Sequence, residues 1–164
     1  MATPQIQTTY PNGQARGQAG QKSRTSAPYN GDRVKIGAAG LEAGAAFTLN
    51  GSGEAIPLTS TTQGVRVEGV LMYEASALND EATGAIGEYA VGKFVPYMEE
   101  GYIYAVAGET IAKGANIGYN PTTNKWIDTG LPVATQLKVL TAVDDAVLDD
   151  VIEVKVGARV VATA

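Results

Sequence analysis

Apolar and polar residues alternate along short stretches of this chain, and turn residues separate the stretches. Val34 and Ile36 alternate with Arg33 and Lys35, which is the period-two pattern of a strand with one buried face. Residues 64–73 begin with the same alternation and end in a run of apolar residues, as in a strand that is buried on both faces. We find no convincing helical period longer than about two turns. The pattern therefore predicts a chain built of strands.

Turn residues join the predicted strands into hairpins. Three hairpins are expected: residues 45–49 with 54–58, residues 91–98 with 102–106 around the turn Glu99–Glu100–Gly101, and residues 115–119 with 125–128. Two further strands, residues 136–141 and 151–156, follow towards the C-terminus. Many short strands with turns every 8–12 residues or so are typical of sandwiches and barrels. We therefore expect an all-β fold, a small β-barrel or jelly-roll of short antiparallel strands.

The N-terminal segment lacks this pattern. Residues 1–28 are rich in Gln, Gly, Ala, Thr and Ser, and Ile6 is their only aliphatic residue beyond alanine and the initiator methionine. Such a segment cannot bury enough apolar surface to offset its loss of conformational entropy. We expect residues 1–28 to form an arm that is disordered alone or extended along a partner, and residues 29–164 to form the β domain. A terminus without a role is the alternative.

The charges divide at the same boundary. Residues 1–29 carry Arg16, Lys22 and Arg24 and no acid, so they have a net charge of +3, whereas the remaining residues have a net charge of −8. The chain as a whole has a net charge of −5, which argues against nucleic acid as the partner of the body. A basic arm on an acidic body suits a protein that holds a partner.

The composition offers little equipment for catalysis. The chain has no His and no Cys, which removes the commonest general base and thiolate chemistry, so we expect no enzyme activity, cofactor or metal. Four aspartates, at positions 144, 145, 149 and 150, could suggest Ca²⁺, but they lack the spacing of a calcium loop and favour a solvated acidic loop. No apolar run approaches the roughly 18–20 residues of a membrane span, so we expect no membrane partner.

Tyrosines gather on neighbouring predicted strands. Tyr97, Tyr102, Tyr104 and Tyr119 belong to this group, and Trp126 lies nearby in the sequence. Tyr and Trp suit a surface that a partner covers, and they suit the ends of a β core equally well. The residues that we expect to contact a partner come from the arm and from these strands: Tyr10, Arg16, Lys22, Arg24, Tyr29, Tyr97, Tyr102 and Tyr104.

Residues from about 64 to 128 carry a recurring order of strands and turns. After the first strand and a polar loop come an acidic turn with glycine, an aromatic strand, an Ala-Gly-acid segment and a Tyr-Asn-Pro-Thr hairpin. Their positions are Glu99–Gly101, Tyr102–Tyr104, Ala107–Ile111 and Tyr119–Trp126. This order resembles the capsid cement, or head-decoration, proteins of tailed bacteriophages.

The resemblance implies a structural, non-enzymatic virion protein with a small all-β barrel. It implies a homotrimer on the outer surface of the capsid, which stabilises the shell by clamping adjacent copies of the major capsid protein. Arg16, Lys22 and Arg24 would then anchor the arm to acidic capsid surface. The composition agrees, because an arm that orders on binding can cover a wide surface.

Two alternatives remain open at this point. The first is a carbohydrate- or receptor-binding β module of a virion, with Tyr102, Tyr104 and Trp126 as a face on which sugars stack. The second is a hydrolase that uses the carboxylate of Glu99 or Asp144.

Overall fold

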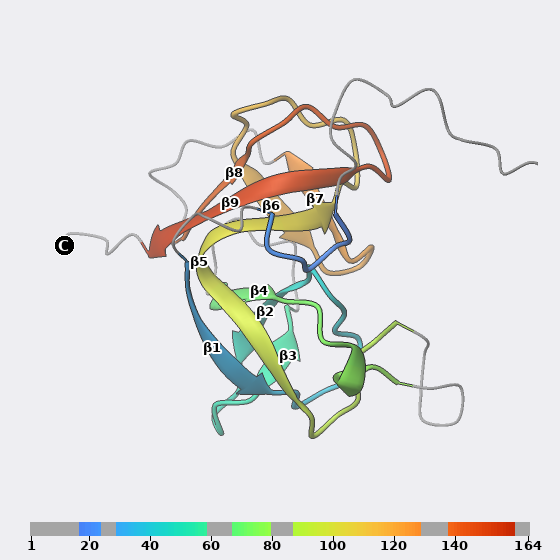
Figure 1. Ribbon diagram of the computed structural model, residues 1–164, viewed down its shortest axis with the longest axis vertical. Helices are drawn as coiled ribbons and strands as arrows, with labels where there is room; N and C mark the ends of the chain where they lie inside the picture. Colours follow the sequence, from blue (N-terminus) through green and yellow to red (C-terminus); the bar gives the residue numbers. More distant parts are fainter. Residues whose placement is uncertain (1–16, 24–28, 59–66, 80–86, 129–137, 160–164) are drawn as a thin grey trace, which may run out of the picture.

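The computed structural model describes residues 17–23, 29–58, 67–79, 87–128 and 138–159 (Figure 1). The regular secondary structure of these residues consists of strands and one short 3-10 turn, η1, at Ala75–Ala77. The strands are β1 (Asn30–Lys35), β2 (Ala46–Leu49), β3 (Ala55–Pro57), β4 (Gly69–Leu71), β5 (Phe94–Val106), β6 (Ile117–Asn120), β7 (Lys125–Asp128), β8 (Lys138–Ala142) and β9 (Val151–Arg159). In the described part of the chain, no helix is long and apolar enough to cross a membrane.

The strands pair antiparallel in the order β3-β2-β4-β5-β9-β8, with β1 added to β5, and β6 and β7 form a separate hairpin. The all-β prediction is therefore confirmed, as are the hairpins β2–β3 and β6–β7. The predicted strand at residues 64–73 is present as β4, although residues 59–66 lie outside the described residues. Within the described ranges no sheet closes into a barrel, so the finer expectation of a barrel or jelly-roll is not confirmed.

Strand β5 runs uninterrupted through the position of the predicted middle hairpin, and that prediction is wrong. The first half of β5 pairs with β1 and β4, and its second half pairs with β9 (Figure 1). The partners change at Gly101, whose φ of 143° lies outside the range that other residues readily adopt. Glu99–Glu100–Gly101 therefore bends a long strand from one set of neighbours to the next instead of reversing the chain.

The core lies where the inner faces of these strands meet, and Trp126 is at its centre. Its side chain is fully buried, and its indole N–H donates a hydrogen bond of 2.9 Å to the carbonyl oxygen of Gly44. The ring packs edge-on against Tyr119 with 5.4 Å between centroids, and Phe47 packs in the same way against Tyr97 at 5.2 Å. Buried aromatic pairs of this geometry contribute beyond the apolar area that they remove from water.

Candidate partner-binding surface

Residues 17–23 of the arm lie along the second half of β5 and form what we call the arm seam. The amide of Gly20 donates to the carbonyl of Tyr104 at 2.7 Å, and the amide of Tyr104 donates to the carbonyl of Gln21 at 2.9 Å. The amide of Ser23 donates to the carbonyl of Tyr102 at 3.0 Å. Because β9 pairs with this stretch of β5 on one edge, the arm occupies the other edge and satisfies its backbone groups.

Two glycines allow the arm to lie close against the body. A Cβ at Gly17 would stand 2.5 Å from the ring of Tyr104, closer than any side chain can come. Gly20 has a φ of 81°, and a Cβ there would stand 2.8 Å from the amide nitrogen of Tyr73. That amide donates to the carbonyl of Gly20 at 2.9 Å, so the arm also contacts the segment that follows β4. The seam depends on residues without side chains at these two positions.

The arm also satisfies a buried acid of the body. Glu153 lies on β9 in register with Tyr104 and is 9% exposed. Ser23 Oγ donates a hydrogen bond of 2.6 Å to Glu153 Oε1. A buried carboxylate needs such donors, because its desolvation is otherwise costly. The seam is therefore a specific contact and involves side chains as well as backbone.

A cation–π contact and a hollow lie where the arm meets β1. Lys22 Nζ stands 4.5 Å from the centroid of the Tyr29 ring, which is about half exposed. Tyr29 and Tyr97 both line a hollow of about 340 Å³, together with charged Asp32 and Arg33. Burial raises the pKa of the Tyr97 hydroxyl, and nearby acids add to the shift, so this group stays protonated and can donate a hydrogen bond at neutral pH.

The structure describes five of the eight residues that we expected to contact a partner: Lys22 of the arm, Tyr29 just before β1, and Tyr97, Tyr102 and Tyr104 of β5. Tyr10, Arg16 and Arg24 lie outside the described residues. The described ones are brought together in two places: Tyr29 and Tyr97 line the hollow with Lys22 over the Tyr29 ring, and Tyr102 and Tyr104 form the backbone bonds of the seam. Their contact with a partner stays a prediction.

Sequence reasoning missed several residues of this surface. Ser23, Gly17 and Gly20 are unremarkable in a segment rich in Ser and Gly, and nothing local links Ser23 to Glu153, which is 130 positions away. The close approach at the two glycines becomes visible only when β5 lies beside them. The only feature of the sequence that could have indicated these residues is the abundance of small residues in the basic arm.

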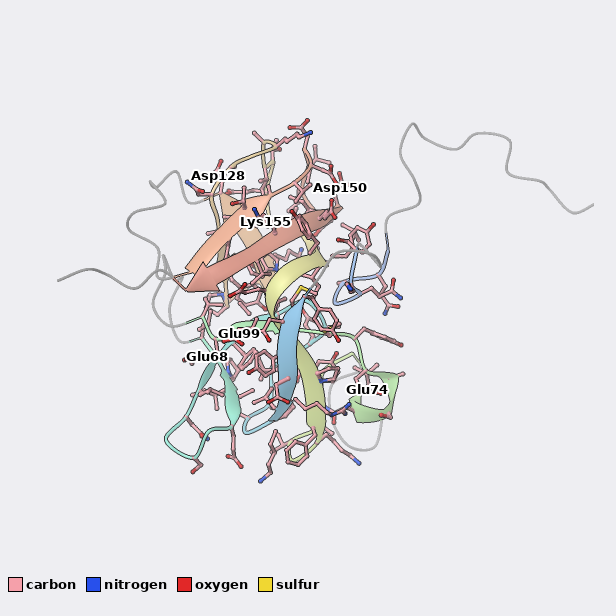
Figure 2. All side chains as sticks on the ribbon, turned by 60° about the vertical axis from the view of Figure 1, so that its left-hand side comes forward. Glu68, Glu74, Glu99, Asp128, Asp150 and Lys155 are labelled. Carbon is pink, nitrogen blue, oxygen red and sulfur yellow. The ribbon has the colours of Figure 1, made fainter. Side chains whose placement is uncertain are left out.

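The alternatives gain no support from this surface. The first alternative needs Tyr102, Tyr104 and Trp126 to form a face on which sugars stack. Trp126 is fully buried, so it cannot be part of such a face. Glu99 is partly exposed and accepts a hydrogen bond of 3.3 Å from the side-chain amide of Asn30 on the neighbouring strand (Figure 2). Among the residues that the structure describes, no group of three or more acids is placed to hold a metal ion.

Comparison with known families identifies the class of protein. The family model described as structural cement protein (E217 gp24/Pam3 gp6), a phage family, matches residues 6–161. The chain belongs to this family. The match spans most of the arm as well as the body, and it confirms the resemblance seen in the sequence. No curated protein matches the chain significantly.

Membership makes this chain a structural protein of the phage virion. A cement protein is located in the capsid and associates with capsid proteins.

Proposed function

We propose that this cement protein decorates the outer surface of the capsid as a homotrimer and clamps adjacent subunits of the major capsid protein. In this proposal the body supplies the trimer, and the arm reaches neighbouring subunits. Arg16, Lys22 and Arg24 contact acidic capsid surface, together with the tyrosines at positions 10, 29, 97, 102 and 104.

The observation that supports the clamp is the arm seam. Backbone hydrogen bonds to Tyr102 and Tyr104, and the bond from Ser23 to Glu153, fix residues 20–23 on the body. The described end of the arm is therefore attached to the body at residues 20–23. A clamp needs such an attachment, because a segment that is already partly ordered loses less entropy on binding and transmits load to the body.

Charge and copy number support the same proposal. An arm with a net charge of +3 on a body of −8 is suited to an acidic partner surface that the body itself would repel. Many copies on one shell act in parallel, so each contact can be modest while the shell gains considerable stability.

Co-sedimentation with capsid particles that have been stripped of cement protein tests the proposal. The full chain should saturate the particles and protect them from heat, and its mass in solution should be that of a trimer. A chain without residues 1–16 keeps the whole seam, so it should stay folded but bind the particles more weakly. R16A should weaken binding in the same direction, whereas K113A, at an exposed lysine between β5 and β6, should not.

The outcomes separate the parts of the proposal. Full binding without residues 1–16 would remove the arm from the clamp and leave the body surface. Failure of the full chain to bind stripped particles would overturn the decoration function itself, and a monomeric mass would overturn the trimer.

A further inference from the structure

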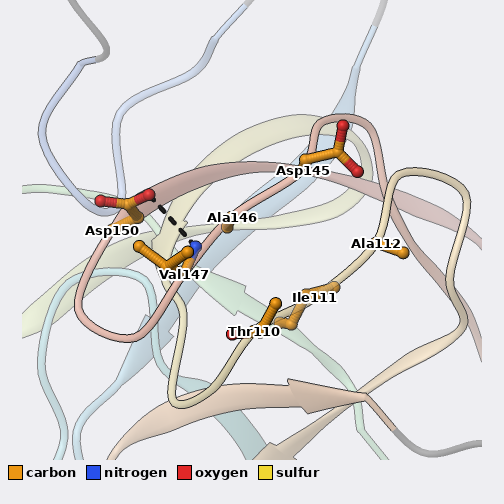
Figure 3. Close-up of a pocket in the computed structure, with 7 residues that line it drawn as sticks. All are labelled: Thr110, Ile111, Ala112, Asp145, Ala146, Val147 and Asp150. Atoms are coloured by element: carbon orange, nitrogen blue, oxygen red, sulfur yellow. Dashed lines mark hydrogen bonds between the residues drawn. The ribbon is translucent and has the colours of Figure 1, made fainter.

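An apolar groove with an acidic rim lies at one end of the body. It is lined by Thr110, Ile111, Ala112, Asp145, Ala146, Val147 and Asp150, and has a volume of about 290 Å³. Figure 3 shows the carboxylates of Asp145 and Asp150 at its two ends, with Ala146 and Ile111 between them. Its floor is fixed, because Ile111 and Ala146 exchange two backbone hydrogen bonds of 2.9 Å. We call this surface the acidic groove.

The turn beside the groove holds aliphatic side chains in solvent. Val147 is 56% exposed and Leu148 is 57% exposed. The turn is built firmly: the amide of Asp150 donates to the carbonyl of Val147 at 3.1 Å, and Asp149, at a φ of 69°, forms an ion pair with Lys125. These two neighbouring aliphatic side chains extend the apolar surface of the groove, and contiguous apolar surface is what marks a site that a partner covers.

The opposite end of the body carries the complementary surface. The segment Val91–Phe94 precedes and begins β5 at the lower end of Figure 1, whereas the loop between β8 and β9 lies at the upper end. Val91 is 59% exposed and Phe94 is 58% exposed, with the exposed Lys93 between them. The guanidinium of Arg33 donates to the carbonyl of Phe94 at 2.8 Å and also forms an ion pair of 3.7 Å with Glu74. We call this surface the basic tip.

We propose that the basic tip of one copy docks into the acidic groove of a second copy. An aromatic side chain such as Phe94 suits the apolar floor, and Lys93 and Arg33 would face the carboxylates at the rim. A second copy is favoured over other occupants because this chain supplies both halves of the match, in apolar character and in charge. The proposal is independent of the clamp, since the contact joins cement proteins to each other.

The position of the two surfaces determines what the contact builds. The surfaces differ from each other and lie at opposite ends, so the contact is head-to-tail and does not close on a pair of copies. It closes into a ring of three or more copies if the rotation between copies allows this, and it otherwise extends into rows. Such a contact can be weak in solution and still form on a capsid, where neighbouring copies are held at high effective concentration.

Charge reversal tests the contact. Sedimentation at increasing protein concentration and low salt should show the full chain associating beyond its basal oligomer. K93E and D150K should each raise the dissociation constant of this step by roughly tenfold, because an attractive surface pair becomes a repulsive one. K155E, a charge reversal on the exposed face of β9, should leave the step unchanged.

Restoration makes the test specific. The double variant K93E/D150K should associate as the unmodified chain does, and so should an equal mixture of the two single variants, because each then meets an opposite charge. F94S should weaken the step without reversing any charge. D150K also removes the hydrogen bond of 3.2 Å that the amide of Val147 donates to Asp150, and this loss could disturb the turn. If association is restored by the opposite charge, a disturbed turn is not the reason why D150K weakens it.

Two results would overturn the proposal. The first is association that neither charge reversal changes, or that the double variant does not restore. The second is loss of attachment by K93E or D150K at sparse occupancy of the capsid, where copies do not touch, because the surfaces would then bind the capsid protein. Attachment of the unmodified chain in the same assay reports on the clamp separately.

Discussion

Ser23 of the arm donates a hydrogen bond of 2.6 Å to the carboxylate of Glu153 in the body. The two residues are 130 positions apart, and they join the segment with the least core-forming character to the strand β9. The contact makes the end of the arm part of the folded unit, and its loss should be measurable both in stability and in the position of the arm.

We expect S23A to lower the free energy of unfolding by about 1–2 kcal/mol, because a buried carboxylate loses a donor. Denaturant titration followed by Trp126 fluorescence measures this change, since Trp126 is the chain's one tryptophan and is fully buried. S52A, at an exposed turn position between β2 and β3, is the control and should change stability little. Equal stability of the two variants would mean that the bond contributes nothing.

We expect G20A to detach the arm. The new Cβ would stand 2.8 Å from the amide nitrogen of Tyr73, and alanine disfavours a φ of 81°. The amide of Tyr104, which donates to Gln21, should then exchange with deuterium about five- to thirtyfold faster, as expected for a loss of about 1–2 kcal/mol in local stability.

G51A is the matched control for this glycine, because a Cβ there would have no neighbour within 4 Å. Unchanged protection of the Tyr104 amide in G20A would show that the seam does not depend on the close approach of Gly20.

We expect Glu42 to make stability dependent on pH. Partial burial raises the pKa of its carboxyl, and the nearby carboxylate of Glu88 raises it further, while Lys125 opposes the shift. The folded protein therefore holds this proton more tightly than the unfolded chain. Proton binding by Glu42 therefore stabilises the fold fully below the ordinary pKa of glutamate. This stabilisation is lost as the pH rises through the raised pKa of Glu42 in the folded protein.

E42Q should remove this loss, so the variant should be more stable than the unmodified chain at neutral pH. The advantage should shrink as the pH falls towards the ordinary pKa of glutamate, and unfolding curves across that range measure it. E100Q, at an exposed acid of β5, is the control. An advantage that stays constant over the whole range would show that the charge of Glu42 is not its source.

The alternation of apolar and polar residues, together with the turn residues between the strands, determined the class of fold. Val34 and Ile36 are buried as their alternation predicts, and the turn residues around Asn50 join β2 to β3 as expected. These features depend on neighbours within a few residues, so the sequence encodes them directly. Composition likewise separated the basic arm from the acidic body.

The tertiary structure alone decided which edges and partners each segment has. Glu99–Glu100–Gly101 has the composition of a turn, but pairing with β1, β4 and β9 carries the chain through it as one strand. Residues 20–23 have no apolar side chains that could form a core. They dock nevertheless, because their backbone groups pair with an open edge of β5. Every residue has a backbone carbonyl and every residue except proline has a backbone N–H, so no residue type signals where backbone pairing occurs. The site of such pairing depends on strands far away in the sequence, and only the folded chain brings those strands together.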